Sequence, residues 1–160
     1  MYTPPPSVYR NMNLIPIWKE YAMPFIVMQK PKQIKLDYKS NFEYQNVWFD
    51  KEKMDSITKN LISNAIKYTP AHGEVHIIIC HDKDNWSLEI TDTGIGIPAK
   101  EQKKLFKLHF RGSNAINAKI TGSGIGLMLV YKLVKLHKGR IQIQSTEHQG
   151  TCVQITFPKG

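Results

Sequence analysis

Apolar residues recur along two stretches of this chain with the spacing of one helix face. Between Lys51 and about Tyr68 they return every three to four positions, at Met54, Ile57, Leu61 and Ala65. Asp50 precedes this run and has the chemistry of an N-cap, while Pro70 and Gly73 follow it and would end it. A second run of the same kind passes through Leu127, Val130, Leu133 and Val134. The pattern predicts two amphipathic helices.

Other segments alternate between apolar and polar residues, as half-buried strands do. EVHIIICHD and NWSLEITD predict an antiparallel hairpin, in which Trp86, Leu88 and Ile90 share one face. RIQIQS and TCVQITFP predict two further strands, and QIKLDY (Gln33–Tyr38) and NVWF (Asn46–Phe49) predict two short strands around a polar turn. These elements predict an α+β fold, a two-layer α/β sandwich with helices on one face of a mixed, mostly antiparallel sheet.

The remaining segments are less regular. Residues 1–12 are rich in proline and lack periodicity, so we expect a flexible leader or linker remnant before a single domain over residues 13–160. A helix is expected from Pro16 towards Gln29, kinked or ended at Pro24. A short helix is expected from Pro98 to about Leu108.

Composition narrows the class of protein. With 160 residues, 41% hydrophobic and 22% charged, the chain is typical of one globular domain. Cys80 and Cys152 lack metal-ligand spacing and fit reduced core residues. There is no apolar run of 18 residues and no signal-peptide pattern, so we expect no direct membrane contact. The net charge of +9 suits nucleic acid or a small polyanion such as ATP, but the lysines are scattered, which argues against nucleic acid.

The first predicted helix carries polar residues beside its apolar stripe. Asn60, Asn64 and Lys67 are spaced four and three apart and therefore share one face. Taken singly, each fits a solvated surface position. Together, at the edge of the core, they could bind a metal–phosphate group, because amide oxygens suit Mg²⁺ and lysine suits phosphate.

Two glycine-rich motifs add further candidates, DTGIGIP at Asp92–Pro98 and TGSGIGLML at Thr121–Leu129. The first follows a predicted strand, where a carboxylate can accept a hydrogen bond from the exocyclic amine of adenine. The second precedes a helix, where free backbone N–H groups can face phosphate. Neither motif has the form of a dinucleotide-binding loop or a P-loop, and each alone could be an ordinary turn.

Taken together and in this order, the motifs resemble the ATP-binding catalytic domain of sensor histidine kinases, in the GHKL superfamily of the Bergerat fold. NLISNAIKYTP resembles the N box, DTGIGIP the G1 box, TGSGIGL the G2 box and LFKLHFRG the F box. HKGRIQIQS and the Gly150–Thr151 pair resemble the closing strands. The resemblance covers roughly residues 14–158, so the 13–160 domain is expected to be a histidine-kinase-like ATP-binding domain.

The resemblance implies ATP and Mg²⁺ as ligands. Asn64 would ligate the metal. The catalytic candidates would be Asn60, Lys67 and Arg111. A mobile lid of about residues 107–123 would close over the phosphates, and Asp92 would read the adenine amine. The implied ATP-binding residues are Asn60, Asn64, Lys67, Tyr68, Asp92, Gly94, Gly96, Ile97, Arg111, Gly122, Ser123, Gly124, Gly126, Leu127 and Thr151.

Departures from the family pattern refine these expectations. His109 stands where the F box usually has a second aromatic residue, and none of the six histidines has the phosphoacceptor pattern. The resemblance therefore implies that the acceptor histidine lies on a separate dimerisation domain, that a response regulator receiver domain acts downstream, and that this domain is the cytoplasmic part of a membrane-bound sensor kinase.

Two other classes of function stay open. Asn60 occupies the position where ATPases of the superfamily have a glutamate that activates water, so slow intrinsic hydrolysis is expected. The alternatives are another GHKL ATPase or serine kinase, and a non-catalytic nucleotide-sensing module.

Overall fold

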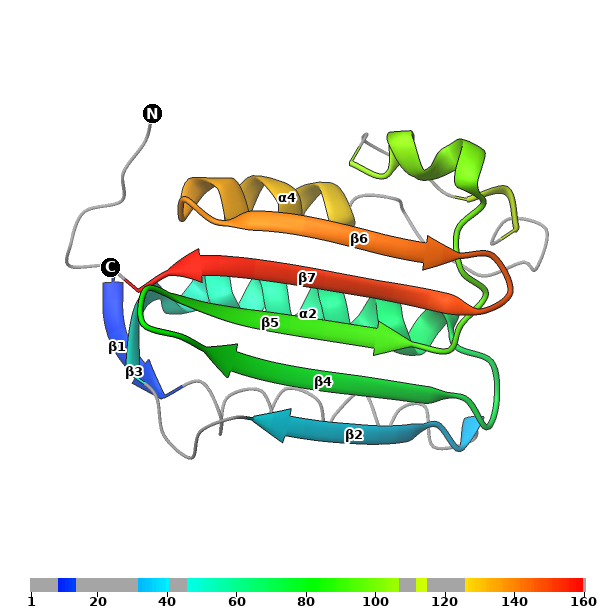
Figure 1. Ribbon diagram of the computed structural model, residues 1–160, viewed down its shortest axis with the longest axis horizontal. Coiled ribbons are helices and arrows are strands. Elements are labelled where there is room, and N and C mark those ends of the chain that lie inside the picture. Colours follow the sequence, from blue (N-terminus) through cyan, green and yellow to red (C-terminus); the bar gives the residue numbers. More distant parts are fainter. Residues whose placement is uncertain (1–8, 14–31, 41–45, 107–111, 115–125, 160) are drawn as a thin grey trace.

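The computed structural model describes residues 9–13, 32–40, 46–106, 112–114 and 126–159 (Figure 1). For residues 9–13 and 46–48 it describes the backbone only. The helix expected over residues 16–29 and most of the expected lid therefore lie outside the described residues. No described helix is both long enough and apolar enough to cross a membrane.

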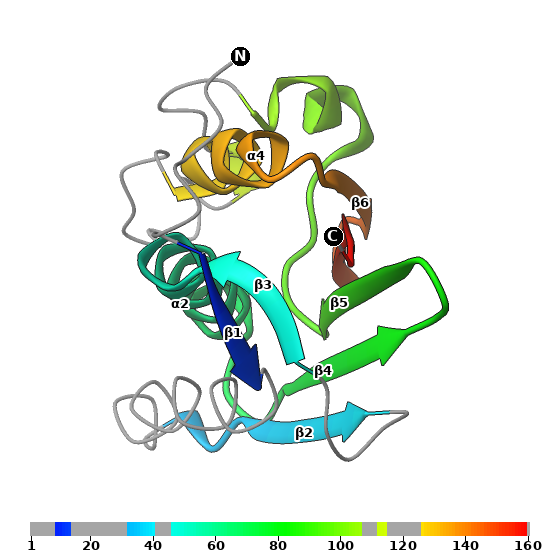
Figure 2. The ribbon, with the colours of Figure 1, turned by 90° about the vertical axis from the view of Figure 1, so that its left-hand side faces the viewer.

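A five-stranded sheet forms one layer, and the helices α2 and α4 lie together on one of its faces (Figures 1 and 2). The strands, in spatial order, are β2 (Lys35–Ser40), β4 (Glu74–His81), β5 (Asn85–Asp92), β7 (Gly150–Pro158) and β6 (Arg140–Thr146). Only the β2–β4 pair is parallel. The expected two-layer, mostly antiparallel α+β architecture is confirmed.

The central hairpin supplies much of the core. β4 and β5 pair antiparallel, with Ile77 opposite Ile90 and Ile79 opposite Leu88. The alternate residues facing the helices are all buried, namely Val75, Ile77, Ile79, Trp86, Leu88 and Ile90. Cys80 and Cys152 carry free thiols but are only half-buried, because they fall on the other phase of this alternation. They are not core residues, contrary to the expectation.

Helix α2 (Lys51–Tyr68) has the predicted bounds. The Asp50 carboxylate accepts a hydrogen bond from the Lys53 backbone N–H at 3.3 Å, so the predicted N-cap is confirmed. All four residues of the apolar stripe are buried, and Thr58, Ile62 and Ile66 widen the buried face.

The carboxyl end of α2 is closed by a lysine from an earlier part of the chain. Lys32 Nζ donates to the carbonyl oxygens of Ile66, Lys67 and Thr69 at 3.3, 3.1 and 3.3 Å. A cation at this end adds a donor to carbonyls at the end of the helix and opposes the negative end of the helix dipole.

The second helical region is confirmed as α4 (Gly126–Leu136), which buries Val130, Leu133 and Val134. The helix expected from Pro98 to about Leu108 is shorter: residues Ala99–Lys104 form the 3₁₀ helix η3, and none of them is buried. AKEQKK offers no apolar stripe that could hold a longer helix against the core.

The amino-terminal part differs most from expectation. Residues 9–13 form strand β1 (Tyr9–Asn13), which pairs antiparallel with β3 (Asn46–Asp50), so residues 9–12 are not a flexible leader. Strand pairing needs backbone groups rather than a side-chain pattern, and YRNMN gives no such pattern. The strand expected over residues 33–38 is shifted to Lys35–Ser40, and it pairs with β4 instead of with the next strand.

Candidate functional site

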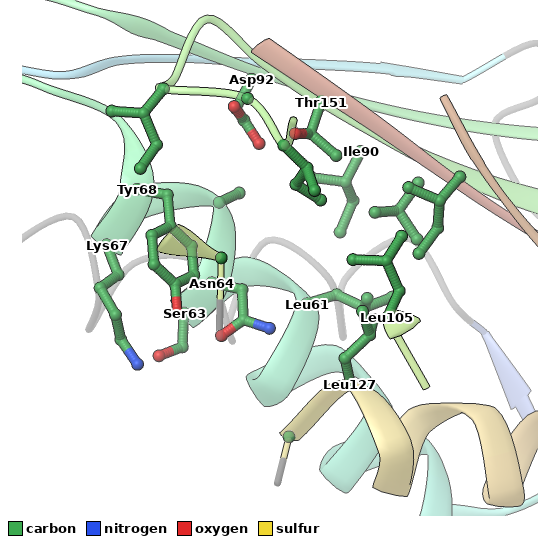
Figure 3. A pocket seen from close by; sticks show the side chains of 18 of the residues that line it. Leu61, Ser63, Asn64, Lys67, Tyr68, Ile90, Asp92, Leu105, Leu127 and Thr151 are labelled. Carbon is green, nitrogen blue, oxygen red and sulfur yellow. The ribbon is translucent and has the colours of Figure 1, made fainter. Parts of the chain in front are cut away.

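The polar stripe of α2 faces a pocket between the helix layer and the sheet (Figure 3). Asn60, Asn64 and Lys67 all line it, as their helical spacing predicts, and all three are half-buried. Ser63 and Tyr68 extend this wall. One side of the pocket therefore carries amide groups, hydroxyls and an ammonium group from a single helix.

The opposite side is formed by Asp92 and Thr151, which are register partners on β5 and β7 (Figure 3). Asp92 is only 8% exposed, and its Oδ1 accepts a hydrogen bond from Gly94 N–H at 2.8 Å. Burial raises the pKa of Asp92 to about 6, against the opposing effect of the backbone N–H groups of Gly94 and Thr151. At neutral pH this side presents a poorly hydrated carboxylate, which would gain from a ligand N–H donor.

The turn after Asp92 passes close to neighbouring backbone on both sides, which requires glycine. Gly96 has a φ of +67°, and a Cβ there would lie 2.1 Å from the carbonyl oxygen of Thr146. A Cβ at Gly94 would lie 2.5 Å from the carbonyl oxygen of Tyr68. Of the two glycines, only Gly96 lines the pocket, while Gly94 supports Asp92 through its N–H.

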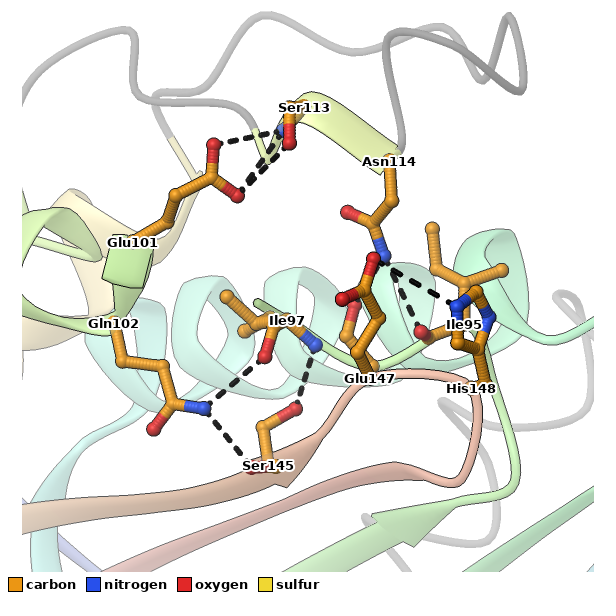
Figure 4. A network of polar contacts seen from close by, with 10 residues as sticks. Ile95, Ile97, Glu101, Gln102, Ser113, Asn114, Ser145, Glu147 and His148 are labelled. Carbon is orange, nitrogen blue, oxygen red and sulfur yellow. Dashed lines mark hydrogen bonds and ion pairs between the residues drawn. The ribbon is translucent and has the colours of Figure 1, made fainter. Parts of the chain in front are cut away.

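Ile95, within this turn, joins three parts of the chain (Figure 4). Its N–H donates to the carbonyl of Tyr68 at 3.1 Å, and its carbonyl accepts from His148 N–H at 2.7 Å. The amide of Asn114 donates to the carbonyls of Ile95 and Gly96 at 3.2 and 2.9 Å. The end of α2, the β6–β7 turn and residue 114 thus hold the turn in place.

The segment over residues 112–114 is the only described part of the expected lid. It is held from a second side, because Ser113 N–H and Oγ–H donate to the Glu101 carboxylate at 3.2 and 3.1 Å (Figure 4). Gly112 and Asn114 line the pocket.

Helix α4 closes the pocket through Gly126 and Leu127. Gly126 lies against α2, since a Cβ there would be 2.6 Å from Asn60 Oδ1. Asn60 Nδ2 donates to the Ser56 carbonyl at 2.7 Å. The Asn60 amide is therefore already engaged on α2, with its oxygen directed to the first residue of α4.

The structure brings most of the described candidates together in one pocket: Asn60, Asn64, Lys67, Tyr68, Asp92, Gly96, Ile97, Gly126, Leu127 and Thr151. Arg111, Gly122, Ser123, Gly124 and the variant F-box residue His109 lie outside the described residues. The pocket volume is about 210 Å³. Because small-molecule sites usually measure roughly 300–1,000 Å³, the described walls form only part of a site of that size.

Several lining residues were not among the candidates. Most are apolar, and their spacing indicates only core positions: Leu61, Ala65, Ile90, Ile95, Leu105, Ile143 and Val153. Ser63 could have been found, because it lies one helical turn from Asn60 and Lys67 on the same side of α2. Asn114 follows an irregular stretch of sequence that has no periodic pattern or recognisable motif.

The donor set also limits which metal could bind. The described residues contain no group of three or more His, Cys, Asp or Glu side chains able to hold a metal. Mg²⁺ commonly takes one or two protein oxygens and completes its shell with water and phosphate oxygens. The amide oxygen of Asn64 fits such a shared ion, and the pocket does not fit a metal held by protein alone.

The comparisons with known proteins agree with this geometry. Residues 49–160 match the family model of histidine kinase-, DNA gyrase B-, and HSP90-like ATPases, and the chain belongs to this family. The resemblance of the motifs to the ATP-binding domain of histidine kinases is confirmed.

The similar curated proteins include histidine kinases and sensory kinases. The chain is 36% identical over 127 residues to the circadian input-output histidine kinase CikA of Synechococcus elongatus, covering 79% of this chain and 17% of that protein. It is 35% identical over 158 residues to the adaptive-response sensory kinase SasA of Rippkaea orientalis, covering 95% of this chain and 39% of that protein. The chain therefore spans less than two fifths of either relative.

Solved structures show the same fold at lower sequence identity. The catalytic domain of histidine kinase ThkA, in a nucleotide-free form, matches with a TM-score of 0.82 at 22% identity, covering 94% of this chain and 95% of that chain. The mycobacterial sensor histidine kinase MprB matches with a TM-score of 0.80 at 24% identity, covering 94% and 97%.

Proposed function

We propose that this domain binds Mg·ATP and donates the γ-phosphoryl group to a histidine on a separate dimerisation and phosphoacceptor domain. One observation carries the proposal: a single pocket is lined by the buried acceptor Asp92 on its sheet side, by Asn64 and Lys67 on its helix side, and by apolar side chains (Figure 3). A flat base with an exocyclic amine and an anionic tail has the matching chemistry. Membership of the ATPase family supports it.

In this proposal Asp92 accepts a hydrogen bond from the adenine amine, Asn64 ligates Mg²⁺, and Lys67 and Tyr68 contact the phosphates. Arg111 and the glycines of TGSGIGL, which lie outside the described residues, would complete the phosphate end. ATP supplies the transferable phosphoryl group. The protein positions it and neutralises its charge, which is the main requirement of phosphoryl transfer.

The proposed partners are the histidine-bearing domain and, downstream, the receiver domain of a response regulator. The relatives, one named a histidine kinase and the other a sensory kinase, support this assignment. The proposed activity uses ATP and belongs to the cytoplasm.

A histidine kinase is favoured over an ATPase by the side chain at position 60. An amide cannot act as a general base for water. Asn60 is moreover held by its hydrogen bond to Ser56 and its contact with Gly126. We therefore expect slow hydrolysis of ATP by the domain alone, and turnover at the rate of a dedicated ATPase would support the ATPase reading.

Binding measurements with two ligands test the two ends of the pocket separately. Isothermal titration calorimetry would compare Mg·ATP with adenosine, which lacks phosphates. Asp92→Asn should weaken both ligands by roughly 10- to 100-fold, because it removes a hydrogen bond to a charged acceptor. Asn64→Ala should weaken Mg·ATP and leave adenosine unchanged. Gln142→Ala, exposed on the sheet face away from the helices, is the matched control.

Phosphotransfer in trans tests the kinase activity itself. The domain, Mg·ATP and a separate acceptor domain would be mixed, and acid-labile phosphohistidine measured. Transfer should require Asn64 and Asp92. Phosphohistidine formed on the domain alone would contradict the proposed separation of the acceptor, and magnesium-independent ATP binding would favour a non-catalytic nucleotide sensor.

A further inference from the structure

Asp92, Thr151 and Ser145 form one row across three neighbouring strands. Asp92 on β5 is the register partner of Thr151 on β7, and Thr151 is the partner of Ser145 on β6. Asp92 and Thr151 line the pocket, whereas Ser145 does not, although all three line a second cavity.

Ser145 makes three polar contacts through its single hydroxyl. Its Oγ accepts a hydrogen bond from Ile97 N–H at 2.8 Å (Figure 4). It lies 3.1 Å from the carbonyl oxygen of Gly150 and 2.8 Å from Thr151 Oγ1. The amide of Gln102 bridges the carbonyls of Ile97 and Ser145 at 3.1 and 2.9 Å, which fixes the backbone on both sides of the hydroxyl.

The hydroxyl protons can be assigned from these contacts. A hydroxyl has one proton and two lone pairs, and a carbonyl can only accept. The Ser145 proton therefore goes to Gly150, and the two lone pairs of Ser145 receive Ile97 N–H and the Thr151 hydroxyl proton. Thr151 is left with lone pairs alone to offer to the pocket.

Three backbone donors of the adjoining turn are also used within the protein. Gly94 N–H donates to Asp92, Ile95 N–H to the Tyr68 carbonyl and Ile97 N–H to Ser145. Beside the Asp92 carboxylate, the Thr151 oxygen is thus a second acceptor. A ligand amine suits this pair, and a ligand carbonyl oxygen would meet lone pairs on both groups.

We propose that Ser145 is a positioning residue that holds the Thr151 hydroxyl as an acceptor, so that the pocket selects a 6-amino purine over a 6-oxo purine. This inference rests on the proposed binding of ATP. When Ser145 lacks its hydroxyl, Thr151 Oγ–H is released and can rotate to donate to a carbonyl oxygen in the pocket. Ser145 acts only through Thr151 and touches no ligand.

The test is the ratio of dissociation constants for Mg·ITP and Mg·ATP, measured by calorimetry on the full chain. ITP carries an oxygen in place of the amine of ATP and has the same sugar and phosphates. Ser145→Ala should lower the ITP/ATP ratio by about 3- to 10-fold, which corresponds to one hydrogen bond gained. Any general loosening of the fold would weaken both nucleotides together and leave the ratio unchanged.

Two further variants separate positioning from packing. Ser145→Thr keeps a hydroxyl and should restore the wild-type ratio. In a Thr151→Val background, Ser145→Ala should no longer change the ratio, because the group it controls is absent. Gln144→Ala, exposed on the opposite face of β6, is the control.

The outcomes distinguish the two proposals. A wild-type chain that binds ATP, with the same ITP/ATP ratio in Ser145→Ala, would overturn the positioning role and leave the proposed function standing. A ratio change that persists in the Thr151→Val background would also overturn it. A wild-type chain that binds neither nucleotide would overturn the proposed function and this inference with it.

Discussion

At the scale of single residues, the ionised form of Asp92 that the proposed function needs lowers the stability of the folded protein. Its carboxyl is 8% exposed, and its pKa is raised to about 6 by burial. A raised carboxyl pKa means that the folded protein holds the proton more tightly than the unfolded chain does. The ionised form, which the adenine amine would need, is therefore the form that costs stability.

This conflict predicts a pH dependence of unfolding. The contribution of Asp92 to the free energy of unfolding is fully present below its ordinary pKa of 3.8 and is lost as the pH rises through about 6. Its size is at most roughly 3 kcal/mol. Asp92→Asn removes the ionisation, so the variant should be more stable than the wild type at pH 7 and similar to it near pH 4.

Urea unfolding of both proteins at several pH values checks this prediction. Equal stability of the two proteins at pH 7 would show that the carboxylate keeps its solvation in the folded state. The same variant should bind nucleotide more weakly, so a gain in stability would accompany a loss of affinity.

A second prediction concerns Gly96. Alanine there needs a positive φ and puts its Cβ against the backbone of Thr146, which cannot move independently. Gly96→Ala should lower the free energy of unfolding by at least about 1–3 kcal/mol. Gly112→Ala is the control, because Gly112 does not have a positive φ and the atom nearest to the added Cβ belongs to the side chain of Asn114 rather than to the backbone. Thermal unfolding of the two variants measures the difference, and equal losses would contradict the argument.

The site residues that could be predicted from the sequence are those that belong to one short motif. Asn60, Asn64 and Lys67 share a helix face, and Asp92 precedes two glycines. The sequence did not predict Ser145, whose bond to Ile97 joins positions 48 apart, or the Asn114 amide, 19 residues from Ile95. Such partners meet only after the sheet has formed, and no local period marks them.

At the scale of elements, α2 depends on contacts at both ends. Asp50 caps its first turn, and Lys32 accounts for three carbonyls at its last turn. The last turn carries Lys67 and Tyr68, and the Tyr68 carbonyl also receives Ile95 N–H. The end of the helix is therefore part of the pocket wall as well as of the core.

Lys32→Met should lower the free energy of unfolding by about 1–2 kcal/mol, because the helix end loses both a cation and hydrogen bonds. Lys35→Met removes a similar charge from an exposed position nearby and should change stability little. Chemical denaturation of the two variants gives the comparison. Equal effects would show that the loss reflects net charge rather than the contact with the helix.

The elements that sequence predicted best are those built from local contacts. The bounds of α2, the β4–β5 hairpin and the β6–β7 pair follow from periodicity and adjacent turns. The parallel pairing of β2 with β4 and the pairing of β1 with β3 join segments more than 30 residues apart. Nothing in a short window specifies such a partner, so these two pairings were missed.

At the scale of the whole molecule, the pocket lies between the helix layer and the sheet. Its walls come from α2, α4, the turn after β5 and strands β5, β6 and β7. No single element contains both proposed ends of the ligand. A shift of α2 away from the sheet would therefore separate Asn64 from Asp92.

The position of β2 in the sheet leads to a prediction about fragments. The family match begins at residue 49, but β2 covers one edge of β4 and lies before that point. A fragment of residues 49–160 would leave the backbone N–H and carbonyl groups of β4 unpaired along an IIIC run. Size-exclusion chromatography with light scattering should show concentration-dependent association of the fragment that the full chain lacks.

The variant Ile78→Lys of the fragment provides a second test. It places a charge on the outward face of β4 and should therefore reduce the association of the fragment. A fragment that stays monomeric at high concentration would contradict the prediction. The segment that the family model matches and the five-stranded sheet of this protein thus have different starting points. An expression boundary drawn at the start of the family match would cut away the strand that is expected to keep neighbouring molecules from adding to the sheet.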